Sequence, residues 1–241
     1  KRKYHFKKTF LLGLFIIVIL HFLGGLINPI NRNTGYPIAL WQTNIPRREK
    51  MNHNDQLINE KLIAAQKIAI SNKANLLITP EGTLNNNFNL FFGSKIRMLA
   101  GGIRNSEDGL RSSLLGYEIG DKTYSFFIDK NRLVPLGEKI PRFLRFFSRE
   151  LSAVGGLQPG SNSRYFEWNF TPPLAVAICY EISDGFKIRN AINNGAELII
   201  SAANLDPYPN KLHNQFLSLA IVRSIENKKD NLIVSNTGPS G

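Results

Sequence analysis

The chain has 241 residues, of which 43% are hydrophobic, and its 30 lysines and arginines outnumber its 18 acidic residues. This length predicts one domain or a modest two, and the apolar content excludes an intrinsically disordered chain. The single cysteine excludes an intramolecular disulfide framework and a zinc site built from several thiolates. A net charge of +12 points to nucleic acid, anionic lipid or another acidic partner, and composition alone does not choose among them.

The N-terminal region predicts a membrane anchor. Residues 1–8 hold five of the thirty basic residues, and the following nineteen carry no ionised side chain. A helix of that length just spans a hydrocarbon core of about 30 Å. We therefore expect a cytoplasmic basic flank over 1–8, a transmembrane helix over 9–28 and a linker over 29–35, with the remainder outside the membrane. A cleaved signal peptide and a buried core helix are the alternatives, and the poor cleavage site and cationic start argue against them.

From residue 36 onward, short apolar runs alternate with helical patterns. Such alternation favours an α/β layered fold. The predicted strands cover 38–43, 76–79, 174–178, 198–201 and 232–235, and a hairpin pairs 112–116 with 123–128. The predicted helices cover 57–69 (capped by Asn54), 90–100, 185–194 and 212–226.

Three of the predicted strands are each followed by one reactive side chain, namely Glu81, Lys130 and Cys179. Active sites of α/β folds commonly lie at strand ends. A thiol can attack a carbonyl once a carboxylate takes its proton and a cation stabilises the oxyanion, so these three could act without a histidine. Taken singly they are weak motifs, because a lone cysteine is usually a small buried hydrophobe and a strand-end Glu or Lys is usually solvated.

The residues around these three positions match a family. The segments 79–83 (TPEGT), 130–138 (KNRLVPLGE) and 178–181 (ICYE) resemble the three signatures of the nitrilase (carbon–nitrogen hydrolase) superfamily. Within it, the middle segment, the run WQTNIP at 41–46 and the stretch 223–241 look like the apolipoprotein N-acyltransferase branch. The resemblance covers about residues 36–241 and implies a nitrilase-like α-β-β-α sandwich, preceded by the transmembrane helix, as the extracytoplasmic catalytic domain.

The resemblance also implies roles for individual residues. Glu81 would be the general base, and Cys179 would attack an acyl ester and hold the acyl group as a thioester. Lys130 and a backbone N–H would stabilise the oxyanion. The supporting residues would be Glu138, which orients the lysine, Tyr180, whose N–H faces the oxyanion, and Glu181.

The reaction implied is ping-pong acyl transfer from a phospholipid to the N-terminal α-amine of a diacylglyceryl-Cys lipoprotein, with no metal or diffusible cofactor. The implied location is the inner (plasma) membrane of a bacterium, with the catalytic domain on the periplasmic side. We expect no nucleic-acid partner, because no basic run interleaved with stacking aromatics is present.

The chain departs from that branch at several positions. Arg132 and Leu136 stand where the branch commonly has His and Phe, and residues 204–208 replace its Trp-containing loop. These departures concern acceptor or acyl-chain preference rather than the three reactive residues. The family continues beyond Gly241 with more strands and a closing membrane helix. We therefore expect a piece truncated at both ends, which alone could be inactive.

A segment after the lysine motif predicts a lipid-facing lid. Residues 141–149 mix three arginines with Phe143, Phe146 and Phe147, a composition suited to the membrane interface. An ordinary amphipathic packing segment explains the pattern equally well. Residues 90–92 are a weaker second candidate for the same role.

Two other functions compete with acyl transfer. The same three residues would serve an amidase or nitrilase that acts on a small water-soluble amide, with water resolving the thioester. The second rival is a catalytically dead, membrane-tethered binding domain. The membrane helix argues against the first rival, and the presence of all three reactive residues argues against the second.

Overall fold

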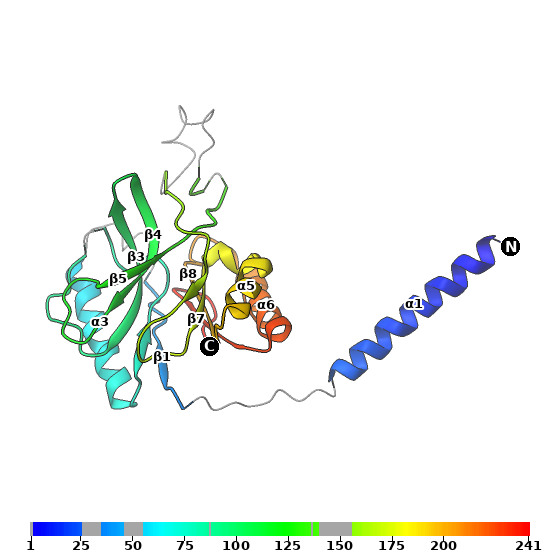
Figure 1. Ribbon diagram of the computed structural model, residues 1–241, viewed down its shortest axis with the longest axis horizontal. Helices are drawn as coiled ribbons and strands as arrows, with labels where there is room; N and C mark the ends of the chain where they lie inside the picture. Colours follow the sequence, from blue (N-terminus) through cyan, green and yellow to red (C-terminus); the bar gives the residue numbers. More distant parts are fainter. Residues whose placement is uncertain (1, 26–34, 46–54, 87, 136, 140–155) are drawn as a thin grey trace. The chain divides into compact units, whose positions relative to one another are not determined.

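The computed structural model describes residues 2–25, 35–45, 55–86, 88–135, 137–139 and 156–241. The chain divides into two compact units, Lys1–Gly35 and Tyr36–Gly241. Figure 1 labels the helices and strands of both units.

The first unit is one helix, α1 (Arg2–Gly25). Its window Lys7–Gly24 has a mean hydropathy of 1.8, and none of that window is buried. Large apolar side chains, among them Phe10, Leu14 and Ile17, are exposed along it. By length and composition, α1 can cross a membrane.

The second unit contains two sheets. The first has the strand order β1-β2-β3-β4-β5, with β1, β2 and β3 parallel and β3, β4 and β5 antiparallel. The second has the order β6-β7-β8-β9, parallel except for β6. The strands are β1 (Ile38–Leu40), β2 (Leu76–Ile78), β3 (Arg97–Ser106), β4 (Gly109–Tyr117), β5 (Phe126–Asp129), β6 (Tyr165–Phe166), β7 (Leu174–Ile178), β8 (Leu198–Ala203) and β9 (Asp230–Ser235).

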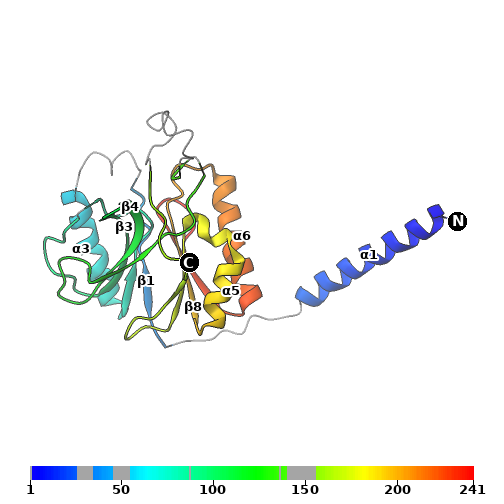
Figure 2. The same ribbon diagram turned by 45° about the horizontal axis from the view of Figure 1, so that its top comes forward.

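Helices cover the outer face of each sheet. Figures 1 and 2 show α3 (Asp55–Ser71) against the first sheet, and α5 (Gly185–Asn193) with α6 (Asn210–Asn227) against the second. A 3-10 turn, η2 (Cys179–Ser183), joins β7 to α5. The four layers are therefore helix, sheet, sheet and helix, which confirms the predicted sandwich.

The strands of the first sheet serve two cores because successive side chains point to opposite faces. Leu76 and Ile78 of β2 belong to the cluster that also holds the residues of β7 and β8. Leu77, between them, packs instead in the cluster with Ile58 and Leu62 of α3. The predicted strands and helices of this unit are found close to their expected places, with one exception.

The helix predicted over 90–100 is wrong, because residues 97–106 form the strand β3. Met98 and Ala100 pack toward α3, whereas Leu99 packs between the sheets, which is the period of a strand. Apolar residues on both faces hide that period in the sequence, as is typical of a buried strand. The predicted hairpin pairing of 112–116 with 123–128 is confirmed, since Leu114 lies opposite Ile128 and Gly116 opposite Phe126 in the β4–β5 ladder.

A glycine in β3 allows the loop after β2 to approach closely. Gly101 donates its N–H to Thr79 Oγ1 (3.1 Å), and its carbonyl accepts the N–H of Leu84 (2.9 Å). A Cβ atom at this position would lie 2.0 Å from Pro80 O and 2.5 Å from the Cα of Glu81. Because Gly101 has no side chain, the backbone of Pro80 and Glu81 can lie directly against β3.

Gly101→Ala should lower the free energy of unfolding by about 1–3 kcal/mol, because the new methyl group meets backbone atoms that cannot rotate away. The measurement is chemical denaturation of the chain in detergent. Gly102→Ala is the matched control, since its added Cβ would meet the flexible end of Leu115. Equal effects of the two substitutions would contradict this explanation.

Candidate active site

The three predicted reactive residues come from three different strand ends and meet in one place. Glu81 lies in the loop after β2, Lys130 directly follows β5, and Cys179 directly follows β7. The first two belong to one sheet and the third to the other. Because the sheets pack face to face, residues distant in sequence become neighbours here.

Lys130 is the centre of the cluster. Its side chain is 0% exposed, and its Nζ lies 2.8 Å from Glu81 Oε1 and 2.7 Å from Glu138 Oε1. Burial acts to lower the pKa of Lys130, but the negative charges of Glu81 and Glu138 and the position of Cys179 outweigh it. The pKa of Lys130 therefore lies well above its ordinary value, and the group is a permanent cation.

Glu81 is a buried carboxylate held by several donors. Its Oε1 accepts hydrogen bonds from Lys130 Nζ and from Ser112 Oγ (3.0 Å), and its Oε2 accepts the N–H of Asn204 (3.3 Å). Burial acts to raise the pKa of Glu81, but the charge of Lys130 and hydrogen bonds from Lys130, Ser112 and Cys179 lower it overall. Glu81 is thus ionised at neutral pH, as a general base must be.

Cys179 is a buried free thiol close enough to Glu81 for the two groups to shift each other's pKa. Burial raises the pKa of Cys179, the charge of Glu81 raises it further, and Lys130 opposes both. The resting group is therefore the neutral thiol. Its backbone φ is +51°, in the left-handed region that a non-glycine residue occupies only under constraint from its surroundings.

Glu138 is the second carboxylate on the lysine. Its Oε1 contacts Lys130, and its Oε2 accepts the N–H of Val134 at 2.8 Å. Burial raises the pKa of Glu138, Lys130 opposes this, and the charge of Glu81 adds to the rise. One cation therefore lies between two carboxylates whose pKa values are shifted in opposite directions.

Glu181 joins the cysteine turn to the lysine loop. Its Oε2 accepts the N–H of Ile178 (2.8 Å), and its Oε1 accepts the N–H groups of Asn131 (2.7 Å) and Arg132 (3.1 Å). Arg164 compensates the charge of Glu181, because its Nη1 atom lies 3.0 Å from Oε1 and 2.9 Å from Oε2. This buried pair constrains the positions of Cys179 and Lys130 relative to each other.

Ser112 and Arg164 were missed by the sequence reasoning. Arg164 also donates from NH2 to the carbonyl of Asp129, the residue before the lysine, at 3.0 Å. Neither residue belongs to a local motif. Ser112 lies within a predicted strand, and only the pairing of that strand with β5 could have indicated that it faces Glu81.

The turn that begins at the cysteine carries an aromatic ring with a cation beside it. Tyr180, next to Cys179, is partly exposed, and the guanidinium carbon of Arg132 lies 5.1 Å from the centre of its ring. Arg132 also pairs with Asp184 at 3.2 Å.

Leu136 and the predicted lid residues lie outside the described residues; these lid residues are Phe143, Phe146 and Phe147. Phe91 and Phe92 of the second candidate segment are exposed.

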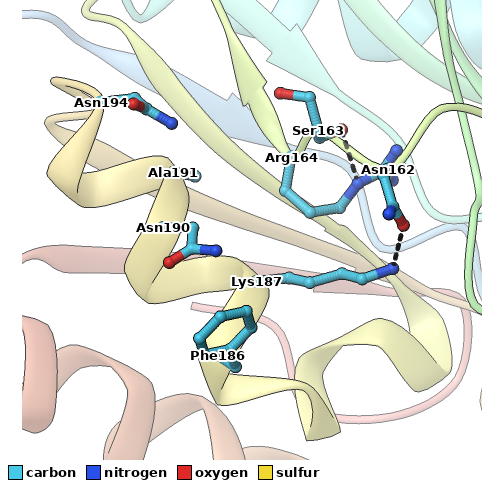
Figure 3. Close-up of a pocket in the computed structure, with 8 residues that line it drawn as sticks. All are labelled: Asn162, Ser163, Arg164, Phe186, Lys187, Asn190, Ala191 and Asn194. Carbon is cyan, nitrogen blue, oxygen red and sulfur yellow. Dashed lines mark hydrogen bonds between the residues drawn. The ribbon is translucent and has the colours of Figure 1, made fainter.

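A cavity of about 270 Å³ runs along α5, apart from the cysteine cluster (Figure 3). Lys187 extends from α5 toward Asn162 and donates to its Oδ1 at 2.8 Å, and it also donates to Asn131. None of Glu81, Lys130 and Cys179 lines the cavity. The lining residues are Asn162, Ser163, Arg164, Phe186, Lys187, Asn190, Ala191 and Asn194.

Within the described residues, no group of three or more His, Cys, Asp or Glu is placed to hold a metal ion.

Curated relatives match the chain over its whole length. It is 80% identical over 241 residues to a protein named apolipoprotein N-acyltransferase from Prochlorococcus marinus subsp. pastoris, covering 100% of this chain and 49% of the relative. A second protein of that name, from another Prochlorococcus marinus strain, is 44% identical over 233 residues, covering 96% of this chain and 47% of the relative. Over the matched residues the chain is similar to these proteins named apolipoprotein N-acyltransferase. It spans about half the length of these relatives.

Solved structures agree on the fold. The chain superimposes on a variant of the Nesterenkonia AN1 amidase from the nitrilase superfamily with a TM-score of 0.57. The two are 18% identical, and the match covers 89% of this chain and 81% of the amidase. At that identity the likeness concerns the fold alone. No protein-family profile matches the chain.

Arg164→Leu should lower the free energy of unfolding of the protein by roughly 3–5 kcal/mol, because it leaves the buried carboxylate of Glu181 uncompensated. The measurement is chemical denaturation in detergent. The control is Arg189→Leu, which removes an arginine that is 57% exposed and 3.8 Å from Glu226; it should cost less than about 1 kcal/mol. An Arg164→Leu protein as stable as this control would disprove the structural importance of the pair.

Proposed function

We propose that this chain contains the catalytic domain of an N-acyltransferase. The reaction moves a fatty acyl chain from a phospholipid to the α-amine of an N-terminal diacylglyceryl-Cys on a lipoprotein. The observation that carries the proposal is the buried Cys179 thiol on the Glu81 carboxylate, which in turn contacts Lys130. The names of the relatives support the choice of substrates.

In the first half-reaction, Glu81 takes the thiol proton as Cys179 Sγ attacks the carbonyl carbon of the phospholipid ester. The resulting oxyanion is stabilised by the Lys130 ammonium and the backbone N–H of Tyr180. Lys130 has three N–H donors and uses two on Glu81 and Glu138, so the third remains for the oxyanion. Collapse breaks the ester C–O bond, and the departing lysophospholipid alkoxide receives the proton from Glu81.

In the second half-reaction, the amine of the lipoprotein attacks the thioester carbonyl, again with Glu81 as the base. The same donors stabilise the second oxyanion. Collapse breaks the C–S bond and forms the amide, and the proton on Glu81 returns to the sulfur of Cys179. Acid–base balance is therefore complete with one carboxylate acting twice.

We further propose that α1 anchors the domain in the inner membrane of a bacterium, with residues 1–8 in the cytoplasm and residues 36–241 on the periplasmic side. The apolar surface of α1 and the basic residues before it support this arrangement.

In this setting Phe143, Phe146 and Phe147 remain the predicted lid. Replacing these three with Asp should slow turnover of membrane-embedded donors, and unchanged turnover would reject the lid.

Turnover by a protein extended to the length of the relatives should depend on all three central residues. With labelled phospholipid and a diacylglyceryl-lipopeptide in micelles, Cys179→Ala should abolish transfer. Glu81→Gln should reduce its rate by about 10²–10⁴, and Lys130→Met by at least about 10². Lys122→Met, which removes an exposed cation, is the control for charge alone. Transfer that persists in Cys179→Ala would contradict the proposal.

An amidase acting on a small amide is the second candidate, because a structural neighbour of the chain is an amidase. The same base, cation and thiol would serve it, with water in place of the amine. Ammonia release from simple amides, together with failure to use phospholipid, would favour this function. A Cys179 inert to electrophiles in the folded protein would instead favour a binding domain without catalysis.

A further inference from the structure

We infer that Ser112 is a positioning residue that keeps Glu81, rather than Glu138, in the ionised form required of the base. Ser112 lies on β4, and its hydroxyl donates to Glu81 Oε1 at 3.0 Å. It does not touch the reacting atoms and acts through the carboxylate. The inference rests on the proposed function, because it assumes that Glu81 is the base of that reaction.

The need for such a residue follows from the charges around Lys130. With both carboxylates ionised, one ammonium faces two negative charges in a region largely removed from water. A region of this kind strongly favours neutrality, so the pair of carboxylates readily takes up one proton. If that proton occupied Glu81, the cysteine would have no base.

Burial alone would place the proton on the wrong residue. The side chain of Glu81 is 9% exposed and that of Glu138 is 15% exposed, so removal from water penalises the charge of Glu81 more. The surroundings act in the opposite sense, because the charge of Lys130 and the hydrogen bonds to Glu81 lower its pKa, whereas burial and the charge of Glu81 raise that of Glu138. Lys130 contacts both carboxylates at almost equal distances and cannot by itself make this difference.

The difference lies in the remaining hydrogen-bond donors. Among the described residues, Glu138 receives one further donor, the N–H of Val134. Glu81 receives two, the N–H of Asn204 and the hydroxyl of Ser112, and the Cys179 thiol also acts to lower its pKa. The thiol is consumed in the reaction and Asn204 contributes only backbone. In the described part of the chain, Ser112 is therefore the one side chain outside the reacting groups that donates a hydrogen bond to Glu81.

Ser112 is itself held in place by the strand ladder. Its carbonyl accepts the N–H of Lys130 at 2.8 Å, and its side chain is buried. The same residue therefore positions the backbone of the cation and a side-chain donor to the base. Among the described residues, Tyr208 is a further titratable group near the cluster, and its pKa is raised chiefly by burial, so it stays neutral.

Ser112→Ala should move the acid limb of the pH–rate profile to higher pH. A base works in its ionised form, so the rate rises with pH through the pKa of Glu81, and loss of a donor raises that pKa. Alkylation of Cys179 by iodoacetamide in the full chain, followed by mass spectrometry, reports the limb without any lipid substrate. We expect a shift of about one pH unit, which is a tenfold lower rate on the acid side, and recovery toward the parent rate at high pH.

Two further variants make the test specific. Ser113→Ala removes an equally buried hydroxyl from the same strand, one that donates to Asp129 Oδ1 at 2.7 Å, and it should leave the limb in place. Ser112→Thr retains the hydroxyl and should return the limb toward the parent position. Should Ser112→Ala fail to fold, Ser112→Cys retains the volume with a weaker donor, and its limb should shift in the same direction.

An acid limb that stays in place in folded Ser112→Ala, or a rate lowered equally at every pH, would overturn the inference. Either result would leave the proposed function intact if phospholipid acyl transfer still occurs. Conversely, a shifted limb in a protein that never uses phospholipid would reject acyl transfer as the function while retaining the effect of Ser112 on the carboxylate.

Discussion

The fully buried ammonium of Lys130 is the constraint on which the candidate site depends. A cation removed from water is tolerated only if opposite charges and hydrogen bonds replace its hydration. Glu81 arrives from the end of β2 and Glu138 from the loop after β5, and both contact the same Nζ atom. The two sheets and their loops therefore converge on one charge, and the cysteine of the second sheet lies beside it.

A second buried pair, Arg164 with Glu181, makes this convergence rigid. Glu181 holds the backbone on both sides of the site, at Ile178 before the cysteine and at Asn131 after the lysine. That frame also maintains the left-handed backbone of Cys179, which the local sequence alone would disfavour. Catalysis by fixed donors requires such preorganisation, because donors that must first reorient lose most of their advantage.

Much of this arrangement could be predicted from the sequence. Alternating strand and helix patterns predict the layered fold. Glu81, Lys130 and Cys179 each lie in a short sequence motif at the end of a predicted strand. Such signals are local, so they survive without a structure. The strand β3 was mistaken for a helix because apolar side chains fill both of its faces, which removes the alternation that identifies strands.

What could not be predicted depends on contacts between distant residues. Ser112 is 31 positions from Glu81, and Arg164 is 17 positions from Glu181. Each is a single polar residue in no motif, and its role follows from strand pairing and sheet packing. The opposite pKa shifts of Glu81 and Glu138 are likewise a property of the assembled site, since the two side chains are chemically the same.

The central claim is that Cys179 carries the acyl group between donor and acceptor. The most direct test is peptide mass spectrometry of the protein, extended to the length of its relatives, after incubation with phospholipid micelles and no amine acceptor. We expect a fatty-acyl increment on the Cys179 peptide that hydroxylamine removes. The same thioester increment should be absent from Cys179→Ser. A folded protein that consumes phospholipid without any such increment on Cys179 would contradict it.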